Sequence, residues 1–207
     1  MKPDALFRRL TAYAAEPCTV VCNIHSVCTP SKNRTYLCGS PQSRVAVIDF
    51  DAVKARFDRM RAKGARKSVD AVALAPSGGC LCFVEMKSWE LMLTNGATEG
   101  DIRRKAGKYE SDLPRKLSDS LALCRQIAGS ARAFDGCPVV YILLSDIAVE
   151  HDALTAFCSD LAALSGTASN LRRLCNELSE EIMEGIGEVE THYWECRQFD
   201  ELMQSVG

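Results

Sequence analysis

An acidic pair and a lysine lie at one end of a β-hairpin that the sequence predicts. Two apolar runs flank residues 76–79, which read Pro-Ser-Gly-Gly, and runs of that length around such a turn are typical of a hairpin. In a symmetric hairpin the paired residue numbers sum to 155. This register places Asp70 opposite Glu85, with Cβ atoms roughly 4.5–5.5 Å apart. Lys87, two residues beyond Glu85, falls on the same face.

These three residue types together suit metal-assisted hydrolysis. Two adjacent carboxylates repel each other, and a hard divalent cation such as Mg²⁺ relieves that repulsion by accepting oxygen ligands. A lysine beside the cation can orient or deprotonate a water molecule, which gives a nucleophile suited to phosphodiester bonds. The alternative interpretation is a structural Glu85–Lys87 ion pair at the edge of a sheet.

The pattern resembles the PD-(D/E)xK nuclease superfamily, which includes many restriction endonucleases and junction resolvases. The resemblance rests on Asp70, fourteen intervening residues and then Glu85-Met86-Lys87 in an apolar strand. Val69 stands where the superfamily's name has a proline. The similarity covers the hairpin and the elements around it, about residues 45–145.

The resemblance implies roles for individual residues. Asp70 and Glu85 would hold Mg²⁺ (or Mn²⁺), the backbone carbonyl of Met86 would be a further ligand, and Lys87 would position the nucleophile. Members of the superfamily often add an acidic residue from an upstream helix. The candidates for that residue are Glu16, Asp49 and Asp51.

The helices and strands expected around these residues indicate an α/β fold. We expect a central mixed β-sheet flanked by helices on both faces, with a restriction endonuclease-like core. The expected elements are a helix at 3–15, strands at 35–38, 44–50, 138–144 and 189–194, and helices capped by Asp51 and Asp112 and at 151–164, 170–184 and 199–203. The hairpin face opposite Asp70 should be wholly apolar, from Val69 to Met86. We expect one domain, 1–207, with a helical C-terminal part at about 150–207.

Charge is distributed unevenly along the chain. Residues 51–67 carry a local charge of +5, whereas residues 174–207 carry −8. A basic helix beside the hairpin could follow a phosphate backbone, although a solvated helix face explains the same count. The candidate nucleic-acid-binding residues are Arg56, Arg59, Lys63 and Lys67. Residues 101–116, which are rich in charged side chains, are expected to form a loop that could also touch a nucleic-acid backbone.

Composition is that of an ordinary globular chain. It has 207 residues, 47% hydrophobic and 25% charged, and neither a membrane span nor a signal peptide is indicated, so we expect a cytoplasmic protein. Eleven cysteines are present, and those at Cys18–Cys38 could form a structural zinc site, although packing cysteines are the simpler interpretation of their spacing.

Together these features predict a Mg²⁺-dependent nuclease, an endonuclease of DNA more than of RNA, in restriction, defence or repair. The alternative is a catalytically inactive subunit of the same fold that scaffolds such a complex. Its C-terminal helices would then bind a partner protein or a second copy of the chain, and a zinc-stabilised interaction protein is a third interpretation.

Overall fold

The structure is a computed structural model that describes residues 1–14, 21–28, 43–60, 66–149 and 167–207. Within these residues six strands form one mixed sheet in chain order. The first three neighbouring pairs are antiparallel and the last two are parallel. The strands are β1 (Val21–Asn23), β2 (Ala46–Asp49), β3 (Ala71–Leu74), β4 (Leu81–Lys87), β5 (Val139–Ser145) and β6 (Glu190–Glu195).

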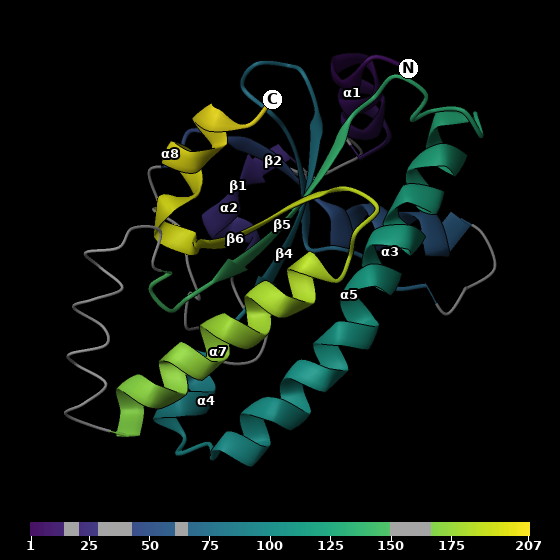
Figure 1. Ribbon diagram of the computed structural model, residues 1–207. Helices are drawn as coiled ribbons and strands as arrows, with labels where there is room; N and C mark the ends of the chain where they lie inside the picture. The colour runs from purple at the N-terminus through teal and green to yellow at the C-terminus, as the bar shows by residue number, and fades with distance from the viewer. Residues whose placement is uncertain (15–20, 29–42, 61–65, 150–166) are drawn as a thin grey trace.

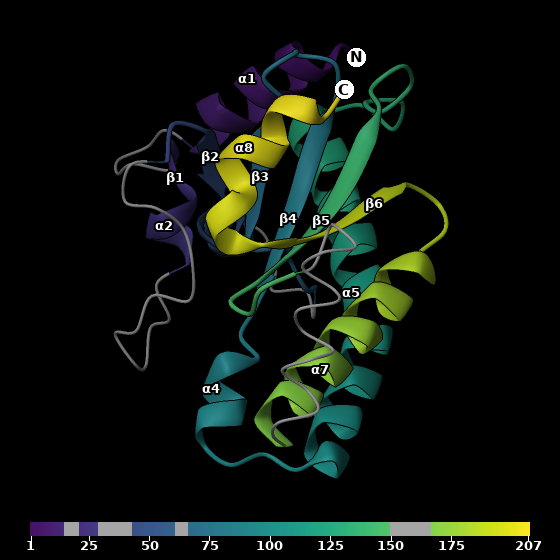
Figure 2. The same cartoon turned by 60° about the vertical axis from the view of Figure 1, so that its left-hand side comes forward.

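Helices cover both faces of this sheet (Figures 1 and 2). The helices on one side are α1 (Pro3–Ala14), α3 (Phe50–Met60), α5 (Glu99–Ala128) and α7 (Thr167–Glu184). On the other side lie α2 (Ile24–Val27), α8 (Phe199–Leu202) and a 3₁₀ turn at Met203–Ser205, while α4 (Glu90–Thr94) follows β4 directly. The predicted α/β class, with a mixed sheet between helices, is therefore confirmed.

The β3–β4 hairpin has the predicted register. Ala71 pairs with Val84 and Leu74 pairs with Leu81, so each pair sums to 155 as expected. Gly78 makes the turn with a positive φ of 72°, a conformation that costs glycine little. Because β3 and β4 are central strands, the hairpin packs against a core on each face. The prediction that Val69 lies on the face opposite Asp70 was wrong. Val69 packs in the core on the Asp70 face, because the chain bends at Asp70 before β3 begins.

Two helix boundaries differ from those predicted. Asp49 caps α3, accepting a hydrogen bond from the Ala52 amide at 2.9 Å, so the helix starts at Phe50 and Asp51 is not its cap. Residues 101–116 are helical, because α5 begins after Thr98 with a reciprocal Thr98–Asp101 capping box. Asp112 is therefore inside the helix. The buried stripe of α5 continues through Pro114, whose cost of about 3 kcal/mol is offset by packing.

The crossover connections explain why β5 and β6 are parallel to β4. A long helix between two neighbouring strands returns the chain to the same edge of the sheet. Here α5 joins β4 to β5, and α7 precedes β6. The helix expected at 151–164, the strand expected at 35–38 and most of the Cys18–Cys38 segment lie outside the described residues. The closing strand and the short helix after it were predicted at their observed places.

Candidate active site

Four elements meet at the charged end of the hairpin. β3 begins just after Asp70, β4 carries Glu85 and Lys87, α3 contributes its first turn, and α5 passes across the strand ends. The paired register of the hairpin ends at Ala71 and Val84, and the Asp70 amide, at the bend before β3, donates to the Val84 carbonyl at 3.1 Å. The Asp70 carboxylate accepts a hydrogen bond from the Met86 amide at 2.7 Å. The structure thus brings together the acidic pair that the sequence predicted.

Glu85 is the most enclosed charged residue of the site, with an exposed fraction of 0%. Its Oε1 accepts from Lys87 and, at 2.6 Å, from Lys116. Its Oε2 is buried and has no hydrogen-bond partner within the described part of the chain. Burial, and secondly the nearby Asp70 carboxylate, raise the pKa of Glu85 to about 7, although both lysines oppose the rise. A buried oxygen with unused acceptor capacity is a potential cation ligand.

Lys116 is a site residue that the sequence interpretation missed. Its Nζ lies 3.6 Å from Asp70 Oδ1 as well as 2.6 Å from Glu85, and only 20% of its side chain is exposed. Burial lowers the pKa of Lys116, but the carboxylates of Asp70 and Glu85 outweigh burial and give a net rise. The available signal was helical spacing, since Lys116 follows the buried Tyr109 by two turns.

Asp51 is the upstream acid that the structure brings to this cluster. It accepts a hydrogen bond from the Ser68 hydroxyl. Burial raises the pKa of Asp51; the Ser68 hydrogen bond opposes this, and the charge of Asp70 adds to the rise. Asp49 is occupied in capping α3, and Glu16 lies outside the described residues. Among the described candidates, Asp51 therefore fits the role of a third carboxylate best.

The Tyr109 ring of α5 contacts the side chain of Lys87. The Lys87 Nζ lies 5.2 Å from the centre of the Tyr109 ring, within the range of a cation–π contact. Trp89 packs edge-on against the same ring, with centroids 5.4 Å apart. Burial, and then the charge of Glu85, raise the pKa of the Tyr109 hydroxyl, so the ring remains neutral at physiological pH. Lys87 is thereby held between the Tyr109 ring and the Glu85 carboxylate.

The four predicted nucleic-acid-binding residues lie in different environments. Arg56 packs over the Tyr13 ring at 5.1 Å, and Lys67 forms an ion pair with Asp112. Arg59 is exposed on α3, and Lys63 lies outside the described residues. Their contact with nucleic acid stays a prediction.

The acidic pair provides oxygen ligands without forming a complete metal cage. In the described ranges no three His, Cys, Asp or Glu side chains form a ready metal-binding group. Met86 packs its side chain in the core on the far face of the sheet, so only its main chain adjoins Asp70. The groups gathered here are the two carboxylates, the main-chain amide of Met86 and, from α3, the Asp51 carboxylate.

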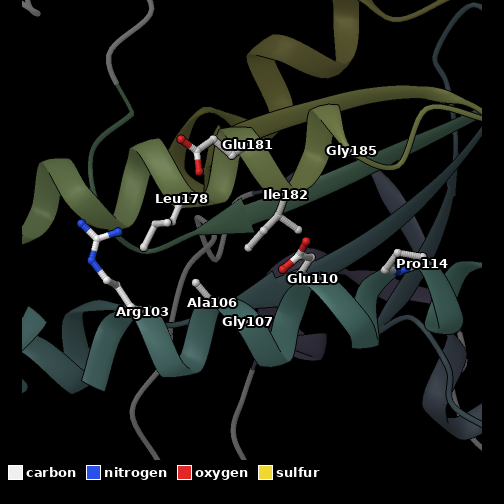
Figure 3. Close-up of a pocket in the computed structure, with 9 residues that line it drawn as sticks. All are labelled: Arg103, Ala106, Gly107, Glu110, Pro114, Leu178, Glu181, Ile182 and Gly185. Atoms are coloured by element: carbon white, nitrogen blue, oxygen red, sulfur yellow. The ribbon is translucent and has the colours of Figure 1, made fainter. Parts of the chain in front are cut away.

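A separate groove of about 370 Å³ lies between α5 and α7 (Figure 3). Arg103 and Glu110 of α5 and Glu181 of α7 line it, and it contains none of the acidic-pair residues.

In the described segments, no helix is both long and apolar enough to cross a membrane. Comparison of the chain with protein-family models, with curated proteins and with solved structures found no match.

Proposed function

We propose that this protein is a metal-dependent nuclease that hydrolyses phosphodiester bonds, of DNA more readily than of RNA, in restriction, defence or repair. One observation carries the proposal: Glu85 is a fully buried carboxylate beside Asp70, and one of its oxygens has no hydrogen-bond partner in the described residues. Removing two like charges from water is costly unless a cation compensates them. The sequence resemblance to PD-(D/E)xK nucleases supplies the same assignment from the residue pattern.

The residues present fit a divalent cation. Asp70 and Glu85 would hold it together with the Met86 carbonyl, and Asp51 is the candidate fourth contributor. When bound, Mg²⁺ or Mn²⁺ would act as a Lewis acid and lower the pKa of a coordinated water molecule. Lys87 would orient that water and contribute positive charge as the phosphorane-like negative charge develops. Lys116 would favour the ionised form of Glu85 against the opposing effects of burial and Asp70, because its ammonium group attracts the carboxylate.

The order of elements supports the finer fold assignment. α1, β2, the β3–β4 hairpin, α5 and β5 follow one another as helix, strand, hairpin, helix and strand, which is the order that the resemblance implies. Further elements are interspersed in this order: β1 and α2 precede β2, α3 lies between β2 and β3, and α4 precedes α5. A restriction endonuclease-like core is accordingly part of the proposal.

A catalytically inactive subunit of the same fold is the second candidate. The observation that favours it is the contact of both lysines with Glu85 Oε1, since two ammonium groups can neutralise a buried carboxylate without a metal. In this reading the cluster holds β4 to α5. The two candidates differ in whether the lysines are needed for turnover or for folding.

The test is a cleavage assay on single- and double-stranded DNA and RNA with Mg²⁺, Mn²⁺ or EDTA. We expect metal-dependent cleavage by the wild type and its loss in Lys87→Met, which keeps the aliphatic stem of the lysine. Lys54→Met is the matched control, because Lys54 is also a half-buried lysine paired with a carboxylate, Asp58, at 2.8 Å. Absence of cleavage of any substrate, or equal cleavage by Lys87→Met, would refute the proposal.

A further inference from the structure

A second group of cations lies beside the candidate active site, at the start of α5. Arg104, Lys105 and Lys108 line a hollow of about 590 Å³ between the first turns of α5 and the end of α4. Asp101 also lines it and pairs with Arg104. Within the described part of the chain, neither Lys105 nor Lys108 forms a salt bridge. The hollow thus presents two ammonium groups that have no ion pair of their own in the described residues.

The Tyr109 ring connects this hollow to the acidic pair. The Lys105 Nζ lies 5.5 Å from the ring centre and the Lys87 Nζ lies 5.2 Å from it. Both cations therefore share one aromatic ring. Lys87 in turn contacts Glu85, so a continuous line of cationic side chains leads from the hollow to the carboxylates.

Spacing along α5 relates the hollow to the size of a nucleic-acid strand. Lys105 and Lys116 are eleven residues apart, which places them on one side of the helix, three turns and about 16 Å apart. One strand of duplex DNA carries a phosphate about every 3.4 Å of axis. Lys87, which is assigned to the nucleophile, is closer to the hollow: its ammonium group and that of Lys105 contact the same ring and are at most about 11 Å apart, an interval of about three nucleotides.

The cationic side chains that line this hollow lie close enough to repel one another. Burial, and then the neighbouring charges of Lys108 and Lys87, lower the pKa of Lys105, because ammonium groups near one another repel. Asp112, one turn beyond Lys108, forms its ion pair with Lys67 and attracts Lys108 only from a greater distance. Clustered cations attract polyanions, and a phosphate backbone would relieve their repulsion.

We propose that the hollow formed by Arg104, Lys105 and Lys108 binds the phosphate backbone of the nucleic-acid strand that flanks the scissile bond. The inference rests on the proposed nuclease function and specifies which surface holds the substrate. It replaces the charged loop expected at 101–116 with one side of a helix. The opposite side of α5, where Arg103 reaches toward α7 (Figure 3), is excluded from the contact.

Binding of short fluorescein-labelled DNA, single-stranded and duplex, tests this by fluorescence anisotropy in EDTA over a series of salt concentrations. Lys105→Gln/Lys108→Gln should weaken binding by about tenfold or more and flatten the slope of log K against log salt by about 1.8 for duplex. The matched control is Arg103→Gln/Arg173→Gln, which removes the same charge from two exposed, ion-paired arginines and should bind as the wild type does.

The outcomes separate this inference from the nuclease proposal. If the double lysine variant binds with the affinity and slope of the control, the hollow is not the backbone site, whatever the cleavage assay gives. If the wild type binds through these lysines but cleaves nothing with any metal, the hollow stands and the nuclease proposal fails. Circular-dichroism melting checks folding; should the double variant unfold, Lys108→Gln alone, at an exposed position, should still lower affinity and slope.

Discussion

Two helices bring positive charge toward the hairpin, and they use it differently. On α3, Lys54 pairs with Asp58 and Arg56 packs over Tyr13, so these charges are engaged within the molecule. On α5, Lys116 reaches the buried acidic pair, whereas Lys105 and Lys108 line an open hollow. The count of basic residues along the sequence favours α3 as the nucleic-acid-binding helix, but the contacts that the side chains make favour α5. The density of charge along a sequence therefore says less than the direction in which each side chain points.

The position of each helix explains this difference. α3 begins at the site with Asp51, but its later turns lead away from the strand ends. Arg66, which follows α3, contacts Phe57 of that helix and Gln126 near the end of α5. The basic end of α3 thus lies near the C-terminal end of α5, whereas Lys105 is near the other end.

The largest effect is expected for Lys116→Met. Removing this ammonium group takes away an ion pair that favours ionised Glu85, so the pKa of Glu85 should rise further above 7. We expect cleavage to fall by about 100-fold or more at neutral pH, and the acid limb of the pH–rate profile to move to higher pH. A structural role alone would not move that limb.

Two further variants make the Lys116 experiment specific. Lys116→Arg should recover part of the activity, because it restores the positive charge. Lys54→Met removes an equivalent α3 lysine and should leave the pH profile in place. A profile unchanged in Lys116→Met would assign catalytic importance to neither helix.

A second prediction concerns the stability of the metal-free protein. The pKa of Glu85 is raised from 4.5 to about 7 in the folded state, so the folded protein binds this proton more tightly than the unfolded chain does. Stability from Glu85 is therefore full below about pH 4.5 and is lost as pH rises to 7, by about 3 kcal/mol at most.

Glu85→Gln mimics the protonated carboxyl and isolates this contribution. In EDTA the variant should unfold at the same denaturant concentration as the wild type at pH 5 and at a higher concentration at pH 8. Urea titrations across this range provide the measurement. A difference between the two proteins that stays constant with pH would mean that the α5 lysine keeps Glu85 ionised throughout, and the raised pKa would be wrong.

The smallest effect is expected on α3. Arg56→Gln/Arg59→Gln should weaken DNA binding by less than about threefold, since Arg56 is held against Tyr13 and an exposed charge distant from the strand is screened by salt. Anisotropy under the conditions used for the α5 lysines gives a direct comparison. A loss as large as that of Lys105→Gln/Lys108→Gln would restore the α3 surface as the main backbone contact.

Local patterns were sufficient to predict the hairpin and its charged end. Alternation with a period of two, and a turn of fixed length, determine which residues face each other, so Asp70, Glu85 and Lys87 could be placed together. The apolar run at 138–144 likewise predicted the strand β5 close to its observed bounds. These features depend on residues close in sequence.

Lys116 could not be placed by the same reasoning. It meets Glu85 across 31 residues of sequence, and that contact depends on how α5 lies over the strand ends. Asp112 was also predicted to cap a helix, whereas the helix begins after the Thr98–Asp101 capping box and its buried stripe continues through Pro114. The Asp51 error was similar: two aspartates near the start of α3 can each cap a helix, and only the hydrogen bond from Ala52 distinguishes them.

The most direct test of a metal site at the acidic pair is the melting temperature of Asp70→Asn with and without Mg²⁺ or Mn²⁺. Asparagine keeps an acceptor for the Met86 amide and removes one of two repelling charges, while Lys116 keeps Glu85 as a partner. In EDTA the variant should melt at or above the wild-type temperature. Asp58→Asn, at the α3 ion pair, controls for the loss of a carboxylate elsewhere.

Adding Mg²⁺ or Mn²⁺ should then change the melting temperatures of these proteins by different amounts. A ligand that binds only the folded state stabilises it by about 2.7 kcal/mol at a hundredfold excess over Kd, so the wild type and Asp58→Asn should gain melting temperature. Asp70→Asn should gain much less, and cleavage should disappear with that gain. If Asp70→Asn instead melts below the wild type in EDTA and responds equally to metal, Asp70 is a structural partner of Lys116 and the account is contradicted.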